Sequence, residues 1–211
     1  MKIDFVSDVS CPWCAIGLNA LEEAIKRVGS TEPVELHFQP FELNPDMAPE
    51  GQDITEHLVQ KYGITAEQAD SNRDAIRQRG RQVGFDFNME RRGRIYNTFD
   101  AHRLLHWAEG QGRQRDLKRA LFSAYFTEGQ DPSDHAVLLK LAVQVGLDES
   151  AARDVLSSDR YAQQVREQER FYAEQGIRSV PSVIINDRHL IQGGQPVELF
   201  EQALRQIAAQ G

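Results

Sequence analysis

The feature that most constrains this chain is the segment Cys11-Pro12-Trp13-Cys14, which holds both cysteines of the sequence. Apolar residues alternate with polar ones over residues 2–7 and predict a strand directly before the segment. Apolar residues then recur at helical spacing as far as Gly29, which predicts a helix starting at the proline, where a missing backbone N–H costs nothing. The cysteines are therefore expected where a strand ends and a helix begins.

This position gives the two thiols different properties. A thiolate at Cys11 would face unpaired backbone amides and the positive end of the helix dipole, which supplies a nucleophile at neutral pH. Cys14 lies one turn further along the helix, close enough to form a disulfide with little backbone movement. The spacing predicts a dithiol–disulfide couple in which Cys11 attacks and Cys14 resolves.

Two other interpretations of the cysteine pair remain open at this stage. The pair could form half of a zinc site, but zinc needs four ligands and the sequence has no second pair of this spacing. His102 and His106, four residues apart, are the candidate partners. Alternatively, both cysteines could be inert core residues.

The composition is that of a globular protein. Of 211 residues, 40% are apolar and 27% are charged, which excludes a disordered or low-complexity chain. The net charge of −8 disfavours nucleic acid or an anionic membrane as a partner, because neutralising phosphates needs clustered cations. We expect no signal peptide and no membrane-spanning helix, and hence a cytoplasmic protein.

The remaining segments predict an α/β architecture with a sheet of about four strands. After the first helix we expect, in order, a strand, a long helical region, a hairpin and a last helix, over residues 34–41, 55–175, 182–192 and 197–209. We divide the chain into a first half-domain, an inserted helical domain and a second half-domain, over residues 1–43, 44–176 and 177–211.

These segments resemble a known family. Cys11-Pro12-Trp13-Cys14 after a strand, a long helical insertion, and Ser179-Val180-Pro181-Ser182 opening a later strand resemble the thioredoxin fold of DsbA-like oxidoreductases over essentially the whole chain. Finer marks are similar to the FrnE-like branch, namely Pro40-Phe41-Glu42-Leu43-Asn44-Pro45, Asn97-Thr98 with Ala101-His102-Arg103-Leu104, Tyr125-Phe126 with Glu128-Gly129, and Gly193-Gly194-Gln195-Pro196. The resemblance implies a thioredoxin-like fold with a large all-helical insertion.

The resemblance also implies which residues bind substrate. Pro181 would be preceded by a cis peptide bond and lie against the cysteine pair, so that the backbone at Val180 pairs with a bound peptide, while Pro12 and Trp13 form part of the surface that meets it. Asn97 and His102 would border the same groove. From the residues alone, Asn97 could equally cap a helix and His102 could lie at that helix's polar edge.

Thiol–disulfide exchange by Cys11 and Cys14 is the activity that the resemblance implies, with no bound cofactor, protein or peptide thiols as substrates and glutathione as a candidate reductant. Even a couple as oxidising as about −120 mV lies about 100 mV above a cytosolic poise near about −220 mV, which favours the dithiol by over ~4 kcal/mol. A resting dithiol suits a reductase or isomerase better than an oxidase. We expect a monomer or homodimer.

Two rival functions belong to other classes. The related 2-hydroxychromene-2-carboxylate isomerase and kappa-class glutathione transferase group carries serine at the position of Cys11 and uses glutathione; having both cysteines argues for redox chemistry here. A non-enzymatic alternative is a chaperone whose apolar groove is lined by Phe99, Trp107, Phe122, Tyr125 and Phe126. A run of arginines over residues 73–94 predicts a solvated helix face, with a local anion site as the alternative.

Overall fold

A four-stranded sheet forms the centre of the computed structural model, which describes residues 1–29 and 33–209. Its order is β2-β1-β5-β6, with bounds Glu35–Pro40, Lys2–Ser7, Ser182–Ile185 and His189–Gln192. β1 runs parallel to β2 and antiparallel to β5, so that Phe5 lies opposite both Phe38 and Val183. Because β1 is a central strand with almost every residue buried, the loop that follows it leaves the sheet from its interior.

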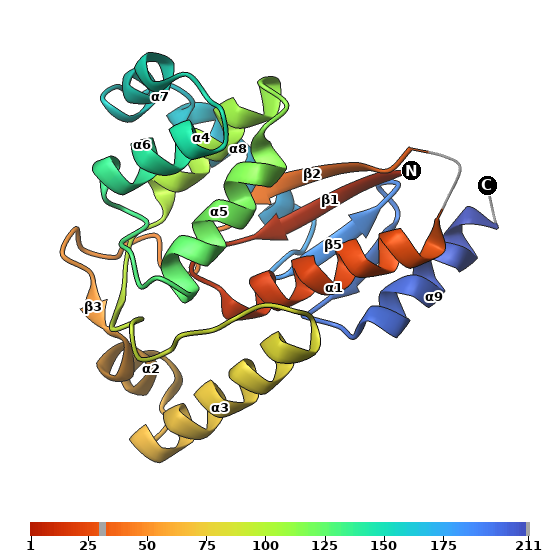
Figure 1. The fold of residues 1–211 in the computed structure, drawn as a ribbon, viewed down its shortest axis with the longest axis horizontal. Helices are drawn as coiled ribbons and strands as arrows, with labels where there is room; N and C mark the ends of the chain where they lie inside the picture. Colours follow the sequence, from red (N-terminus) through yellow and green to blue (C-terminus); the bar gives the residue numbers. More distant parts are fainter. Residues whose placement is uncertain (30–32, 210–211) are drawn as a thin grey trace.

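Two helices lie side by side along this sheet in Figure 1: α1 (Pro12–Val28) and α9 (Val197–Ala208). A small residue lets α1 approach the second half of the chain, since a Cβ on Gly17 would meet Pro181 Cγ at 3.0 Å. A Cβ on Gly194 would likewise meet the carbonyl oxygen of Trp13 at 3.0 Å. Both close approaches bring the chain around Pro181 against the start of α1.

The segment between β2 and β5 is mainly helical and gathers at one end of the sheet (Figure 1). It contains α2, α3, α4, α5, α6, α7 and α8, with bounds Ile54–Tyr62, Ala66–Gln82, Phe99–Gly110, Gln114–Phe126, His135–Gln144, Glu149–Leu156 and Ala162–Glu174. It also holds a pair of two-residue antiparallel strands, β3 (Gln52–Asp53) and β4 (Arg94–Ile95), which the sequence pattern did not indicate because such a pairing is too short for periodicity.

The described residues divide their apolar side chains between two main clusters. One surrounds α1 and the sheet and contains Phe5, Cys14, Phe122 and Phe126. The other lies among the helices of the insertion and contains Leu104, Leu117, Leu121 and Leu138. α5 contributes to both clusters, and it therefore joins the inserted helices to the helix that carries the cysteines.

The predicted order of strand, helix, strand, helical insertion, hairpin and helix is confirmed, and so is the thioredoxin-like α/β class. Glycines end helices where the sequence predicts. Gly29 and Gly63 directly follow α1 and α2 with φ of 57° and 65°, in the left-handed region that glycine adopts without steric cost. Within the residues described, no helix is long and apolar enough to cross a membrane.

Candidate active site: the cysteine pair and its pocket

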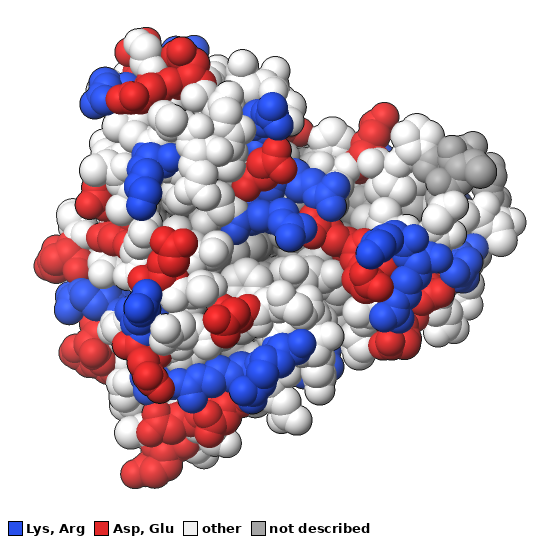
Figure 2. Space-filling view, in the orientation of Figure 1, with Lys and Arg blue, Asp and Glu red and all other residues white. Residues whose placement is uncertain are grey.

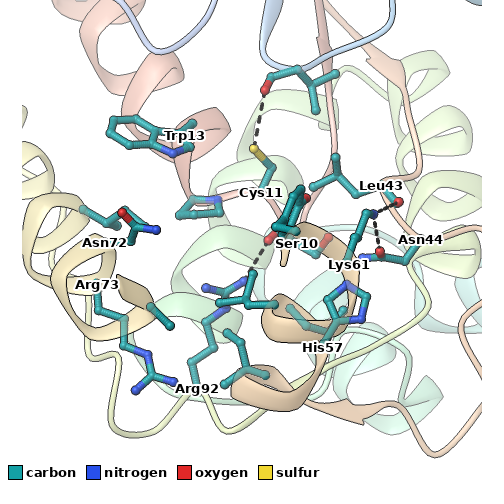
Figure 3. Close-up of a pocket in the computed structure, with 18 of the residues that line it drawn as sticks. Ser10, Cys11, Trp13, Leu43, Asn44, His57, Lys61, Asn72, Arg73 and Arg92 are labelled. Carbon is teal, nitrogen blue, oxygen red and sulfur yellow. Dashed lines mark hydrogen bonds between the residues drawn. The ribbon is translucent and has the colours of Figure 1, made fainter. Parts of the chain in front are cut away.

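Cys11 occupies the N-cap of α1 and opens onto a pocket (Figure 3). The chain leaves β1, turns through residues 8–10 and begins the helix at Pro12, whose ring suits the first helical position. Cys11 Sγ lies 3.7 Å from the carbonyl oxygen of Val180. The Val180–Pro181 peptide bond is cis. The thiol is thus placed between the N-terminus of a helix and the backbone of a segment from the other end of the chain.

Cys14 lies behind Cys11 and is fully buried. Both cysteines are free thiols. Burial, followed by the neighbouring Cys11, raises the pKa of Cys14 well above its usual value. Cys11 is buried as well, at 4% exposed, but it lines the pocket, whereas Cys14 is not among the described lining residues.

The pocket beside Cys11 has a volume of about 800 Å³. Its walls come from the start of α1, the chain after β2, helices α2 and α3, and the segment before Pro181. Much of the surface is apolar, with Phe41, Leu58, Tyr62 and Ile64 among the lining side chains. Trp13 and Tyr62, which are 38% and 56% exposed, stand at its rim. A site of this size can hold a small molecule or a few residues of a peptide.

Among the described residues, four cationic side chains line this pocket: Lys61, Arg73, Arg92 and Arg178. Figure 3 shows Arg73 on α3 and Lys61 on α2 on different sides of it. Lys61 Nζ donates to the carbonyl oxygen of Leu43 and to Asn44 Oδ1, each at 2.6 Å. Arg178 is exposed and lies two residues before Val180. The described lining residues therefore carry more positive than negative charge.

Glu42 is the acidic side chain among the described lining residues, and its charge is offset. Arg166 of α8 donates hydrogen bonds to both Glu42 and Glu169. Burial, with the charge of Glu169, raises the pKa of Glu42 to about 8. The carboxyl group therefore holds a proton or pairs with Arg166 near neutral pH, and it removes little of the positive character of the pocket.

Asp8 fixes the turn between β1 and α1 through hydrogen bonds to its carboxylate. Its carboxylate, fully buried, accepts hydrogen bonds from Ser10 N and Oγ at 3.3 and 3.0 Å and from Leu43 N at 2.7 Å. His102 Nε2 lies 3.4 Å from Asp8 Oδ1. Burial raises the pKa of Asp8, but His102 and the Leu43 amide outweigh it and hold this pKa below its usual value. Asp8 is thus a buried anion that ties the cysteine loop to the chain after β2.

Arg92 supports the same loop. Its guanidinium group donates to the carbonyl oxygen of Ser10 at 3.1 Å and stacks 4.9 Å from the ring centres of Tyr125 and Phe126. Arg92 is buried, although its sequence neighbours Arg91 and Arg94 are exposed. This residue therefore links the residue before Cys11 to α5.

Most residues predicted to bind substrate lie at the pocket. Pro12, Trp13 and Val180 line it, and Pro181 is buried directly behind, against Gly17. Asn97 and His102 are not among the described lining residues. Asn97 accepts a hydrogen bond from Phe99 N at 2.9 Å and donates to the carbonyl oxygen of Pro45 at 3.3 Å, as a residue that fixes the start of α4 does. His102 is buried beneath the site and faces Asp8 rather than the pocket.

The arginine run has mixed roles. In Figure 2 a basic stripe follows α3, with acidic groups beside it; Arg73 pairs with Asp70, and Arg77 pairs with Asp74 and Glu90. These pairs fit the solvated face that the sequence predicts, while Arg73 and Arg92 also line the pocket. The arginine run therefore indicated two of the pocket cations, Arg73 and Arg92. No sequence pattern indicated that Lys61 and Arg178 would line the pocket.

The alternative interpretations find less support in the arrangement of the side chains. Among the residues described, no group of three or more His, Cys, Asp and Glu side chains is placed to hold a metal ion, and His106 lies against Gln168 and Tyr161. Four of the aromatic residues that the chaperone alternative would place in a groove are core instead: Trp107, Phe122, Tyr125 and Phe126 are at most 7% exposed. Aromatic residues at helical spacing are more often core, and here these helical faces pack inward.

The chain is similar to known proteins over almost its whole length. The DSBA-like thioredoxin domain family matches residues 2–205. The uncharacterized protein YwbO of Bacillus subtilis (strain 168) is 30% identical over 206 residues, which cover 97% of this chain and 96% of that protein. The crystal structure of a probable DsbA oxidoreductase, SCO1869 from Streptomyces coelicolor, is 34% identical with a TM-score of 0.93, and the match covers 100% of this chain and 91% of that one.

A more distant structure shares the fold. The cytosolic disulfide reductase DsbM from Pseudomonas aeruginosa, solved with GSH, is 16% identical with a TM-score of 0.70, and the match covers 99% of this chain and 100% of that one. The family match spans the cysteine segment, the helical insertion and the Val180–Pro181 segment alike. The chain therefore belongs to the family of DsbA-like thioredoxin domains, whose members are generally disulfide oxidoreductases.

Proposed function

We propose that this protein catalyses thiol–disulfide exchange on protein or peptide substrates and acts as a reductase or isomerase. The observation that carries the proposal is the asymmetric placement of the two thiols, with Cys11 at a helix N-terminus in the pocket wall and Cys14 buried behind it. The thiolate is the attacking form of a cysteine, and Cys11, although only 4% exposed, borders the pocket from which a substrate would approach. A second thiol within reach can then release the substrate.

The reaction consists of two exchanges. The Cys11 thiolate attacks one sulfur of a substrate disulfide, so that a Cys11–substrate bond forms and the other substrate sulfur leaves as a thiolate. Cys14 then attacks Cys11 Sγ, which forms the Cys11–Cys14 disulfide and releases the second substrate thiolate. Two electrons pass from the protein dithiol to the substrate, and two thiols of a reductant return them. No bound cofactor is needed, because the cysteine couple itself carries the electrons.

Glutathione is the reductant that we propose for the return step. The cations Lys61, Arg73 and Arg178 around the pocket suit a small ligand with carboxylates. The fold is shared with the cytosolic disulfide reductase DsbM, whose structure was solved with GSH. We place the reaction in a reducing cytoplasm, where the couple rests as the dithiol and isolation from acid-quenched cells should yield mostly free thiols.

The experiment that tests this function is a redox titration. Purified protein is equilibrated across a series of glutathione ratios, the thiols are alkylated, and their number is read by mass, with Cys11→Ser as the control. A single two-electron transition that disappears in the control supports the couple, and its midpoint separates a reductant from an oxidant. Reactivation of a protein with scrambled disulfides then tests isomerase activity. Thiols that remain unchanged across the series would refute the proposal.

A glutathione-dependent isomerase or transferase is the second candidate, because a pocket of about 800 Å³ is also of small-molecule size. Such chemistry needs one attacking group only. A Cys14→Ser variant therefore separates the two functions: it keeps isomerase or transferase turnover but loses multiple-turnover disulfide reduction.

A further inference from the structure

Two glutamates beside the pocket share one arginine. Glu42 follows β2 and belongs to the pocket lining, whereas Arg166 and Glu169 lie on α8. A single nitrogen atom, Arg166 Nη1, donates to Glu42 Oε1 and also to Glu169 Oε2, the latter at 2.9 Å. The ring of Phe99 holds this arginine in place, since its centre lies 3.8 Å from Arg166 Cζ. The two carboxyl groups are therefore immediate neighbours.

Each of the two carboxyl groups also has an oxygen atom without a partner. Glu42 Oε2 and Glu169 Oε1 are buried and have no hydrogen-bond partner among the described residues. The Glu42 side chain is only 2% exposed, and a buried polar atom left unsatisfied costs free energy. A carboxyl group that holds a proton becomes a donor, and the neighbouring carboxylate can accept from it. One shared proton thus satisfies the oxygen atoms that the arginine leaves over.

The charge balance points to the same arrangement. Two carboxylates beside one arginine leave a negative charge uncompensated in a buried place, which is unfavourable, whereas one added proton makes the cluster neutral. Burial, followed by the charge of Glu169, raises the pKa of Glu42 to about 8. The pair therefore keeps its proton at neutral pH and loses it in alkaline solution.

Other charged or titratable groups lie on the segments that pack around Glu42. Outside the pocket, these are Asp8, His102 and, on α4, Asp100 with its partner Arg103. In the pocket lining, they are the cations Lys61, Arg73, Arg92 and Arg178 and the side chains of Cys11, His57 and Tyr62. Among the described residues, the Glu42 side chain accepts hydrogen bonds from Arg166 alone. The effect of the pair is therefore measured by comparing variants at each pH.

The helix that this pair fixes supports the wall of the pocket. Phe41, which precedes Glu42, packs in one apolar cluster with Tyr172 of α8 and with Val180. Phe41 and Val180 both line the pocket, and the carbonyl oxygen of Val180 lies 3.7 Å from Cys11 Sγ. The link between Glu42 and α8 therefore holds together two parts of the wall beside the reactive thiol.

We propose that Glu42 and Glu169 form a proton-sharing pair that positions the pocket wall for a peptide substrate, and that deprotonation of the pair weakens peptide binding. The effect on substrate rests on the proposed thiol–disulfide exchange, whereas the pair itself is detected without it. When the proton is lost, two carboxylates repel each other beside one arginine. The hydrogen bond between them is then lost as well, and α8 is held less firmly against Phe41 and Val180.

Infrared spectroscopy detects the shared proton directly. At pH 7 ordinary carboxyl groups are ionised, so the absorption of a protonated carboxyl group stands out against them. We expect one such band in the wild type at pH 7, its loss by pH 10, and its absence from Glu42→Gln and Glu169→Gln. Glu149→Gln, which removes an exposed ion pair with Arg153 on α7, is the control and keeps the band. Thermal unfolding verifies that each variant is folded.

Kinetics with an acidic peptide disulfide test the effect on binding. In each variant of the pair, the glutamine amide donates to the remaining carboxylate at every pH and so mimics the protonated pair. The ratio of the wild-type KM to the variant KM cancels the titration of Cys11 and of the substrate. This ratio should be near one at pH 7 and rise about two- to tenfold by pH 10, the effect of about one hydrogen bond. The kcat ratio should stay constant, and Glu149→Gln should give a KM ratio near one throughout.

Different results would overturn different parts of the inference. Absence of the band from the wild type, or its persistence in both glutamine variants, removes the shared proton. A KM ratio that stays near one up to pH 10 removes the role in positioning, and both of these results leave the proposed function intact. A wild type that does not reduce the peptide disulfide at any pH removes the proposed function and the role in binding with it, while the band still reports the pair.

Discussion

The carbonyl oxygen of Val180 lies 3.7 Å from Cys11 Sγ, although the two residues are 169 positions apart in the chain. This contact closes the site, because it brings the backbone that precedes Pro181 to the thiol at the N-terminus of α1. A peptide joined to Cys11 would lie next to this backbone, whose polar groups are then available as hydrogen-bond partners.

Because Cys11 attacks and Cys14 resolves in the proposed reaction, we expect their serine variants to behave differently. Cys11→Ser should lose essentially all exchange with a peptide disulfide, since the buried Cys14 is inaccessible. Cys14→Ser should accumulate a mixed disulfide at Cys11, because the resolving thiol is absent. Intact-mass measurement after acid quenching checks both. Accumulation of an adduct on Cys14 in the Cys11→Ser protein would contradict this assignment.

The close approach of α1 to Pro181 predicts the effect of Gly17→Ala. The new Cβ would lie 3.0 Å from Pro181 Cγ, so α1 or the Val180–Pro181 segment must give way slightly, at a cost of roughly 1–3 kcal/mol in the free energy of unfolding. Alanine offsets up to ~1 kcal/mol of this cost through its higher helix propensity, which leaves a net loss of up to ~2 kcal/mol. We also expect slower exchange, because the shift moves Val180 relative to Cys11. Urea unfolding and exchange rates measure the two effects.

Gly110→Ala is the matched control for this prediction. Apart from its chain neighbours and the backbone of its own helix, no atom of the described residues lies within 4 Å of a Cβ built on Gly110 in the last turn of α4, so the substitution should be neutral or stabilise the helix by up to ~1 kcal/mol. Equal stability changes at the two positions would show that the Pro181 contact is not a constraint.

Arg178, an exposed cation that lines the pocket, predicts a preference for acidic substrates. Arg178→Ala should raise KM for an acidic peptide disulfide by about 1.4- to fivefold, since an exposed charge pair contributes roughly 0.2–1 kcal/mol, and the effect should shrink as salt is added. Arg188→Ala, exposed between β5 and β6 and remote from the pocket lining, is the control. A salt-independent change, or an equal change at Arg188, would argue against charge recognition.

The ammonium group of Lys118 on α5 is fully buried, and Nζ has no hydrogen-bond partner among the described residues. Removing this group should therefore raise the free energy of unfolding by an amount that depends on pH. Burial lowers the pKa of Lys118 from 10.5 to about 8, so the folded protein binds fewer protons than the unfolded chain between these values and is stabilised as pH rises through them. Below about pH 8 both states are protonated and the penalty is complete. Lys118→Met should therefore be more stable than wild type by about 3 kcal/mol at pH 7, and the difference should narrow towards pH 10.

Thermal or urea unfolding of the two proteins across this pH range checks the prediction. Lys140→Met, which removes an exposed lysine, should show no such trend. A less stable Lys118→Met protein at pH 7 would mean that the ammonium group stabilises the fold.

Local sequence determined the elements that hold the cysteines. The strand before Cys11 and the helix that begins at Pro12 follow from alternation, helical spacing and the fit of proline to a first turn, all of which are interactions between near neighbours. Lys118 also left a local signal, since it precedes Phe122 and Tyr125 by four and seven residues and so shares their buried face of α5.

Only the tertiary structure decided which distant groups meet at the site. The meeting of the pocket cations Lys61 and Arg178 and the placement of His102 against Asp8 instead of in the groove depend on how the inserted helices pack on the sheet. That packing is a sum of many weak apolar contacts between segments far apart in the chain, and no pattern within one segment records which partner it will meet.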